Sequence, residues 1–400
     1  MTLNEKYLMP NNVSMDGIED TGLRGVRAAT SRISLVDGEA GRLIYRGYAI
    51  EDLAKWSTFE ETCYLLLNGE LPNAEQLNTF SKELTSNREL PLSILEALHS
   101  QPLGTTPMAI LSAMVSLMSG TCPDHGDDSL EANRRKAVRI IAMMPTVVAA
   151  WKRLRRDQKP IDPDPSLSHA ANFLYMIGGK KQSKTMNRFM DVALILQADH
   201  GFNASTFTSR VVASTRATMY SAVSAGIGAL SGSLHGGANA QVMRNLIDVN
   251  DPNNVEEWVE EQFRNGERIS GMGHAVYKTI DPRAAILRGM AQAIMDNSPE
   301  FRWYEMTERM ILATQRHFRA AKGREIYPNI DMYTASIYHT MGIDPDFYPA
   351  VFAMARSAGW TAHISEEKFP TDPVRPVLYR PVCVYRGEMD REYVPIEDRC

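Results

Sequence analysis

The sequence predicts an all-α fold, because apolar residues recur at intervals of three and four over most of the chain. Such spacing places them on one face of a helix. Strand-like alternation is confined to one short region near the N-terminus. With 400 residues, 44% of them hydrophobic, the chain can bury a large core and exceeds the usual size of one domain. We therefore expect a helical protein of two domains, or of one domain with a large insertion.

The first expected element is a short β-hairpin within residues 32–47. Residues 32–36 alternate in polarity and lead into Asp37-Gly38, a dipeptide typical of tight hairpin turns. Residues 42–47 supply a second strand. A hairpin of this size is too small to define the fold.

Helices are expected to follow the hairpin. Asn73 and Gln76 form a capping pair ahead of apolar residues that share one helical face. Residues 298–300 similarly open a helix whose apolar stripe is typical of core packing. The apolar stretch 140–151 falls short of the about 20 residues that a membrane span requires, so it predicts one or two buried helical segments.

Two further stretches have unusual composition. Residues 220–232 are almost all small, and Gly228 and Gly232 would allow a second helix to approach closely, within or between subunits. Residues 369–400 contain five prolines, which disfavour long helices and favour an extended arm.

Composition and charge exclude several classes of protein. The 43 basic and 48 acidic residues give a net charge of −5, which argues against a nucleic-acid or membrane-surface partner. Residues 1–12 lack the apolar core of a signal peptide, so we expect a cytoplasmic protein. No Cys-x-x-Cys spacing occurs, and therefore no disulfide framework or cysteine zinc site is expected from the four cysteines, Cys63, Cys122, Cys383 and Cys400.

Four short segments concentrate histidine, glycine and arginine more than core packing requires. They are residues 198–206, 231–239, 271–283 and 327–333. Glycines beside a histidine let backbone and ligand approach closely. Each segment alone is weak evidence for a functional site, because a single histidine in a glycine-rich loop is more often structural than functional.

Together the segments offer two histidines and an aspartate for general acid–base chemistry: His235, His274 and Asp331. A proline and an asparagine precede Asp331, which favours a carboxylate fixed at a turn or helix start. No serine or cysteine lies in a nucleophile elbow, and the histidines lack the partners of common zinc motifs, so metal catalysis is disfavoured.

In this order, the four segments resemble the citrate synthase family. The resemblance extends over most of the chain, because residues 38–48, 59–72 and 355–363 and the pair Arg375-Pro376 match as well. The joint match is highly specific, although no single motif is.

The resemblance implies condensation of acetyl-CoA with oxaloacetate, followed by hydrolysis of the thioester, with no metal or redox cofactor. Asp331 would remove a proton from the acetyl group while His235 donates a hydrogen bond to the thioester oxygen. His274 would polarise and protonate the ketone of oxaloacetate. The residue types suit this task, because an ordinary aspartate can deprotonate so weak a carbon acid only if the developing enolate oxygen is stabilised at the same moment.

The resemblance also assigns residues to substrate binding. Carboxylates favour planar arginine partners, and Arg283, Arg356 and Arg375 would bind those of oxaloacetate together with His200. In the family the last of these arginines reaches the other subunit's site, which implies a homodimer and leaves a larger homo-oligomer open. Candidates for the CoA phosphates are Lys278, Lys322 and Arg324.

The matching positions also divide the chain. A large helical domain would comprise residues 1–236 and 343–400, and a small helical domain of residues 237–342 would be inserted in it. His235 lies at one crossing and Asp331 near the other, so the site would lie in the cleft between the domains. We expect oxaloacetate to bind first and to close this cleft.

Two alternatives are left open. A 2-methylcitrate synthase would accept propionyl-CoA, which has one more methylene, and the sequence does not locate the pocket that discriminates. Tyr277-Lys278 looks more like bacterial citrate synthases than like that relative, whereas Ser233 stands where the family commonly has proline. A catalytically idle relative could act in assembly or binding, but it would have no need to keep His235, His274 and Asp331.

Overall fold

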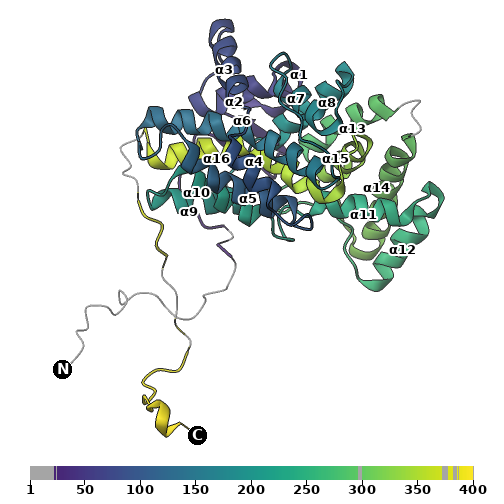
Figure 1. The fold of residues 1–400 in the computed structure, drawn as a ribbon. Helices are drawn as coiled ribbons and strands as arrows, with labels where there is room; N and C mark the ends of the chain where they lie inside the picture. Colours follow the sequence, from purple (N-terminus) through teal and green to yellow (C-terminus); the bar gives the residue numbers. More distant parts are fainter. Residues whose placement is uncertain are drawn as a thin grey trace. The chain divides into compact units, whose positions relative to one another are not determined.

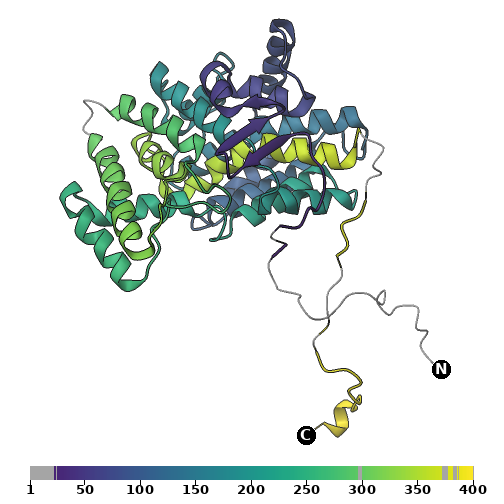
Figure 2. The same cartoon turned by 180° about the vertical axis from the view of Figure 1, so that it is seen from behind.

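In the computed structural model the described residues are 22–23, 25–295, 300–371, 377–381, 385 and 387–399. The chain comprises two compact units, Met1–Arg32 and Ile33–Cys400, and every helix and strand below lies in the second. Helices make up most of this unit, as Figure 1 shows, and Figure 2 shows the strands from behind. The predicted all-α fold is therefore confirmed.

The strands are β1 (Ser34–Asp37), β2 (Arg42–Tyr45) and β3 (Tyr48–Ala49). The first helices are α1 (Ile50–Trp56), α2 (Phe59–Asn68), α3 (Ala74–Ser86), α4 (Leu92–His99), α5 (Pro107–Met118), α6 (Leu130–Leu154), α7 (His169–Gly178) and α8 (Lys184–Gln197). They are followed by α9 (Ala204–Ser214), α10 (Met219–Leu230), α11 (Ala238–Val249), α12 (Val255–Asn265), α13 (Pro282–Met295), α14 (Phe301–Lys322), α15 (Ile330–Thr340) and α16 (Tyr348–Lys368). Short 3-10 turns are η2 (Ser119–Thr121), η3 (Pro252–Asn254), η4 (Pro345–Phe347) and η5 (Ile396–Asp398).

The predicted hairpin is present and forms an antiparallel sheet in the order β1-β2-β3. Ser34 pairs with Tyr45 and Asp37 with Arg42, so the turn lies at residues 38–41. The Asp37 carboxylate closes this turn by accepting the backbone N–H groups of Glu39 at 3.1 Å and Ala40 at 3.0 Å. The sequence did not indicate the third strand, which is only two residues long.

The helix signals are confirmed where they lie on described residues. Asn73 and Gln76 cap each other reciprocally at the start of α3, with distances of 2.9 and 2.8 Å. The apolar stretch 140–151 belongs to one helix, α6, which continues through Pro145. Residues 298–299 lie outside the described residues, and α14 begins at Phe301.

The long helix α16 runs through the middle of the helical packing and contacts α2, α6, α8, α9 and α10 (Figure 1). Its buried residues include Trp360 and Arg356, which are 0% and 1% exposed. Helices α11 to α15 pack mostly on one another, and they reach the other helices through α13 and α11. None of the helices in the described part of the chain combines the length and apolar composition needed to cross a membrane.

Candidate active site

The four sequence segments converge on one cavity of about 380 Å³. His200 precedes α9, His235 precedes α11, His274 precedes α13, and Asp331 lies in the first turn of α15. Arg283 from α13 and Arg356 from α16 complete the charged lining. The sequence positions span more than a hundred residues, so the fold itself assembles this site.

His235 is held by Ser205 at the start of α9. The Ser205 backbone N–H lies 3.3 Å from Nε2 of His235, and its hydroxyl oxygen lies 2.9 Å from the same atom. The hydroxyl is in turn fixed by the indole N–H of Trp360, which donates to it at 3.2 Å. Burial and the charge of Arg356 lower the pKa of His235 to about 4, so the imidazole is neutral at physiological pH. Since a backbone N–H can only donate, we assign the proton of the neutral ring to Nδ1.

His274 is held by its own loop. The backbone N–H groups of Val276 and Tyr277 donate to Nδ1 at 3.0 and 3.1 Å. Two such donors make Nδ1 an acceptor, which places the proton of the neutral ring on Nε2. A longer contact of 3.5 Å joins Nε2 to Arg283, and the two shorter bonds decide the tautomer. Burial and the Arg283 charge lower the pKa of His274 to about 4.

Asp331 combines a fixed backbone with an unsatisfied carboxylate. Its N–H donates at 2.9 Å to the side chain of Asn329, the N-cap residue of α15. Its carboxylate makes no hydrogen bond or ion pair to any other described residue, although it faces the cavity. Burial raises its pKa to about 6, and the positive charge of Arg283 opposes that shift. Such a carboxylate is ionised at neutral pH and more basic than an ordinary aspartate.

The two arginines differ in how their charge is balanced. Arg283 is 3% exposed and forms a bidentate pair with Asp281, at 3.0 Å from Nε and 2.9 Å from Nη2. Arg356 is 1% exposed, donates to the carbonyl of Gln197 at 2.8 Å, and has no carboxylate within ion-pair distance among the described residues. Burial lowers the pKa of Arg356 to about 10, which still leaves it charged. The charge of Asp199 offsets this burial only in part, and no described carboxylate lies within ion-pair distance of Arg356. The cavity therefore contains a buried cation whose charge is incompletely balanced, which favours an anionic ligand.

His200 lines the same cavity and packs against the loop that carries His274. Its ring packs edge-on against His274, with centroids 5.3 Å apart, and its Nε2 lies 3.3 Å from the Tyr277 hydroxyl. Burial, together with the neighbouring Arg283 charge, holds its pKa well below the usual value. It can therefore offer a neutral hydrogen-bonding edge to a ligand.

The residues suggested for CoA phosphates are only partly brought together. Lys278 and Arg324 line a second cavity of about 430 Å³, which also includes Gly273 and His274 and so adjoins the first. Lys322 ends α14 and does not line either cavity. Arg375 lies outside the described residues, as do Cys383 and Cys400, whereas Cys63 and Cys122 are buried free thiols.

The sequence did not single out two residues that shape the site. Ser205 and Asp281 position His235 and Arg283 through the hydrogen bonds given above. Each lies inside one of the four segments, but neither a serine nor an aspartate there has a spacing that reveals its partner. Asn329, in contrast, fixes the backbone of Asp331 at the start of a helix, as its place before that residue predicts. Among the described residues no group of three or more His, Cys, Asp or Glu side chains could hold a metal ion.

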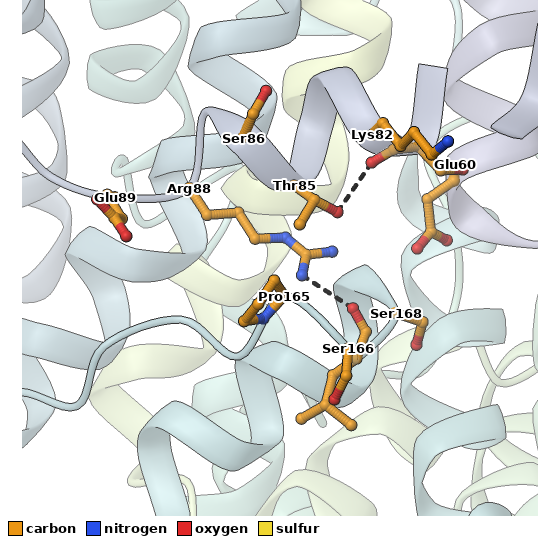
Figure 3. A pocket seen from close by; sticks show the side chains of 11 residues that line it. Glu60, Lys82, Thr85, Ser86, Arg88, Glu89, Pro165, Ser166 and Ser168 are labelled. Atoms are coloured by element: carbon orange, nitrogen blue, oxygen red, sulfur yellow. Dashed lines mark hydrogen bonds between the residues drawn. The ribbon is translucent and has the colours of Figure 1, made fainter. Parts of the chain in front are cut away.

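A larger cavity of about 590 Å³ lies elsewhere, between the end of α3 and the loop before α7 (Figure 3). Arg88 reaches into it and donates to the carbonyl oxygens of Leu167 at 2.8 Å and Asp164 at 3.4 Å. These bonds fasten the loop to the segment that follows α3, so we interpret Arg88 as structural. None of the candidate catalytic residues lines this cavity, and size alone does not make it the site.

Comparison with known proteins covers nearly the whole chain. A family model described as the citrate synthase C-terminal domain matches residues 22–382. A citrate synthase of Haloferax volcanii is 44% identical over 390 residues, which are 96% of this chain and 100% of the relative. The 2-methylcitrate synthase 1 of Corynebacterium glutamicum is 39% identical over 94% of this chain and 98% of its own length.

A solved structure gives the same result. The citrate synthase of Thermoplasma acidophilum, determined as a ternary complex with carboxymethyl coenzyme A and oxaloacetate, superposes with a TM-score of 0.87. It is 33% identical and covers 94% of this chain and 98% of its own. The helical fold is thus that of proteins that carry this name.

Proposed function

This chain belongs to the citrate synthase family and is an acyltransferase of that type, and from this premise we propose that it condenses acetyl-CoA with oxaloacetate to give citrate and CoA. The observation that carries the proposal is the convergence of His235, His274 and Asp331 on one cavity beside Arg356, a buried cation with no described carboxylate within ion-pair distance. Asymmetric pKa values support it, because one carboxylate is made more basic while both imidazoles stay neutral.

In the first step Asp331 takes a proton from the methyl group of acetyl-CoA. The raised pKa of Asp331 strengthens it as a base, and the neutral His235 donates a hydrogen bond from Nδ1 to the thioester oxygen as negative charge develops there. A neutral donor stabilises this developing charge without binding the ground state strongly. The product of the step is an enol or enolate of the thioester with its carbon exposed to the second substrate.

In the second step this carbon attacks the ketone carbon of oxaloacetate. His274 donates from Nε2 to the ketone oxygen and supplies the proton that the new alkoxide takes. Arg283, Arg356 and His200 hold the two carboxylates, and Arg375 is proposed to join them from the partner subunit of a homodimer. Water then hydrolyses the thioester and releases CoA. No step needs a metal or redox cofactor.

CoA is proposed to extend from the catalytic cavity into the adjoining one. Lys278 and Arg324 line that second cavity and can meet phosphate groups. Lys322 is the weaker candidate because it lies outside both linings. The proposed cleft separates residues 1–236 and 343–400 from residues 237–342, and a cytoplasmic location stays a prediction.

The second candidate is a 2-methylcitrate synthase, which the likeness to the Corynebacterium glutamicum enzyme keeps open. One additional methylene in an apolar pocket changes binding by about 1–3 kcal/mol, which a few side-chain contacts supply. We favour acetyl-CoA because the more similar Haloferax volcanii relative is named a citrate synthase.

One assay tests both candidates. The purified protein is mixed with oxaloacetate and either acetyl-CoA or propionyl-CoA, and free CoA thiol is followed with time. We expect thiol release that depends on oxaloacetate and is faster with acetyl-CoA. A mixture without oxaloacetate controls for simple thioester hydrolysis. Release with neither thioester would contradict the enzymatic function, and a preference for propionyl-CoA would select the second candidate.

A further inference from the structure

The tip of the N-terminal hairpin touches the loop that carries His274, backbone against backbone. The N–H of Lys278 donates to the carbonyl oxygen of Gly38 at 2.9 Å. A Cβ atom placed on Gly38 would lie 2.2 Å from the carbonyl oxygen of Val276, closer than any real contact allows. Glycine is therefore required at residue 38 by the approach of the loop.

A second glycine of the same turn fits the same loop. Gly41 has a φ of +64°, and a Cβ on it would lie 2.7 Å from the methyl group of Thr279. The turn itself is held by the Asp37 carboxylate, which accepts two backbone N–H groups. The hairpin tip is thus a pre-formed surface that matches residues 276–280.

The loop that meets the hairpin also fixes the ring of His274. Val276 and Tyr277 give their N–H groups to Nδ1 of His274, and Lys278 follows immediately. The same backbone segment therefore contacts the hairpin tip and also holds the catalytic ring, and Val276 takes part in both contacts. A displacement of this segment would move the ring.

The body of the hairpin holds the His200 loop. The Ser34 hydroxyl donates to the carboxylate of Asp199 and accepts the N–H of Gly201 at 3.1 Å. The Tyr45 hydroxyl donates to the carbonyl oxygen of Asp199 at 2.8 Å. His200 lies between Asp199 and Gly201 in the chain. The small sheet therefore contacts both loops whose histidines are proposed to meet oxaloacetate.

We propose that the hairpin is a clasp that sets the distance between the His200 and His274 loops, and that Gly38 is a positioning residue for the condensation. This inference rests on the proposed function of the cavity. It assigns a role in catalysis to a two-strand element whose residues do not line the cavity.

The backbone contact between Lys278 and Gly38, and not the neighbouring ion pair, holds the hairpin against the His274 loop. Lys278 and Glu39 form a salt bridge above the turn, but each side chain is 73% exposed. Pairs so exposed contribute little and are screened by salt. Lys278 therefore remains available to a phosphate group while its N–H stays bound to Gly38.

Substitution Gly38→Ala tests the clasp. Because a displacement of about 1 Å at a catalytic group can cost about a hundredfold in rate, we expect kcat for thiol release to fall by about tenfold to a hundredfold. The ratio kcat/KM for acetyl-CoA should fall by the same factor, since His274 acts in the transition state. Gly104→Ala is the matched control, because Gly104 has no atom within 4 Å of its would-be Cβ.

A merely structural role for Gly38 predicts a different result. The variant would then lose melting temperature by more than about 4 °C while its folded fraction kept the wild-type kcat and KM. That outcome would overturn the proposal. Glu39→Gln, which removes only the exposed pair, should leave kcat within about twofold; a loss equal to that of Gly38→Ala would also overturn it, because charge would then be the cause.

Hydrogen exchange on the unmodified enzyme gives an answer even if Gly38→Ala does not fold. We expect the peptide containing residues 276–280 to exchange as slowly as the peptide containing residues 42–45, because the Lys278 N–H is bound to the hairpin. Exchange as fast as that of the surface loop 101–106 would contradict the clasp. This measurement needs no turnover, so failure of the clasp and failure of the proposed reaction are distinguished.

Discussion

Arg356 is the residue where proposed function and stability oppose each other most clearly. Its guanidinium is 1% exposed, no described carboxylate lies within ion-pair distance of it, and the charge of Asp199 offsets its burial only in part. Removing a charge from water without a partner is costly. Folding therefore leaves a desolvation penalty at Arg356, and a bound anionic substrate relieves part of it. This relief contributes to the affinity for a carboxylate.

Substitution Arg356→Met should separate the two effects. Methionine has a similar length and can pack on Phe352, over whose ring the guanidinium now lies at 4.7 Å. We expect the ligand-free variant to be as stable as the wild type or more so, while oxaloacetate affinity falls by about thirtyfold or more, the equivalent of about 2–5 kcal/mol. Chemical denaturation and calorimetry measure these quantities.

The matched control is Arg283→Met, which breaks a buried ion pair. It leaves Asp281, 1% exposed, without its partner, so this variant should lose about 3–5 kcal/mol of unfolding free energy. Equal destabilisation by both substitutions would show that the charge of Arg356 is balanced within the fold and that no penalty is left for oxaloacetate to relieve.

The pKa of Asp331 predicts how activity depends on pH. The base must be ionised, and burial raises its pKa to about 6, so kcat/KM for acetyl-CoA should fall to half near pH 6 and continue to fall below it. The two catalytic imidazoles, with pKa values lowered to about 4, stay neutral over this range and do not produce the decline. Thiol release from pH 4.5 to 8 measures the profile, with circular dichroism at each pH to confirm folding.

Asp331→Asn is the control for that profile. The amide should bind oxaloacetate and lose nearly all turnover, at every pH. Retained activity would remove Asp331 from the role of base. If the activity of the wild type began to fall only below pH 5, burial would not raise the pKa of Asp331 as expected.

At the scale of elements, the sequence predicted what depends on neighbouring residues. The hairpin turn at Asp37-Gly38 and the capping box of Asn73 and Gln76 are local, and both are confirmed. Tertiary packing decides the rest. Pro145 does not end α6, although its ring removes a helix hydrogen bond, because almost every residue around it is buried.

The small-residue helix α10 shows the same limit. The spacing of Gly228 and Gly232 suggested the close contact, but the crowded position within the chain is Gly226. A Cβ there would lie 2.4 Å from the Ser209 hydroxyl of α9 and 3.2 Å from the Trp360 ring of α16. Gly228 has open space around it in this single chain. Which glycine of a stripe faces a neighbour depends on the rotation of the helix, which the sequence does not determine.

At the scale of the whole molecule, the candidate site could be predicted only as a set. No periodicity places His200 near His274 or Arg356 near His235, because these contacts join loops and helices far apart in the chain. The resemblance supplied that grouping, and the structure brings six of the seven proposed catalytic and oxaloacetate residues to one cavity. The seventh, Arg375, lies outside the described residues, so its place at a subunit boundary stays a prediction.

The proposed cleft leads to a test in solution. Oxaloacetate would contact His200 and Arg356 on one side of the domain boundary and His274 and Arg283 on the other. A ligand that binds both sides favours the closed arrangement, because only that arrangement offers all its contacts.

We therefore expect small-angle scattering to show a smaller radius of gyration when oxaloacetate is added, and a forward intensity that corresponds to twice the chain mass. Acetyl-CoA alone should produce less compaction, and Arg356→Met should produce none at the same oxaloacetate concentration. An unchanged radius with calorimetrically proven saturation would contradict closure by oxaloacetate, and a monomer mass would contradict the shared site that Arg375 is proposed to complete.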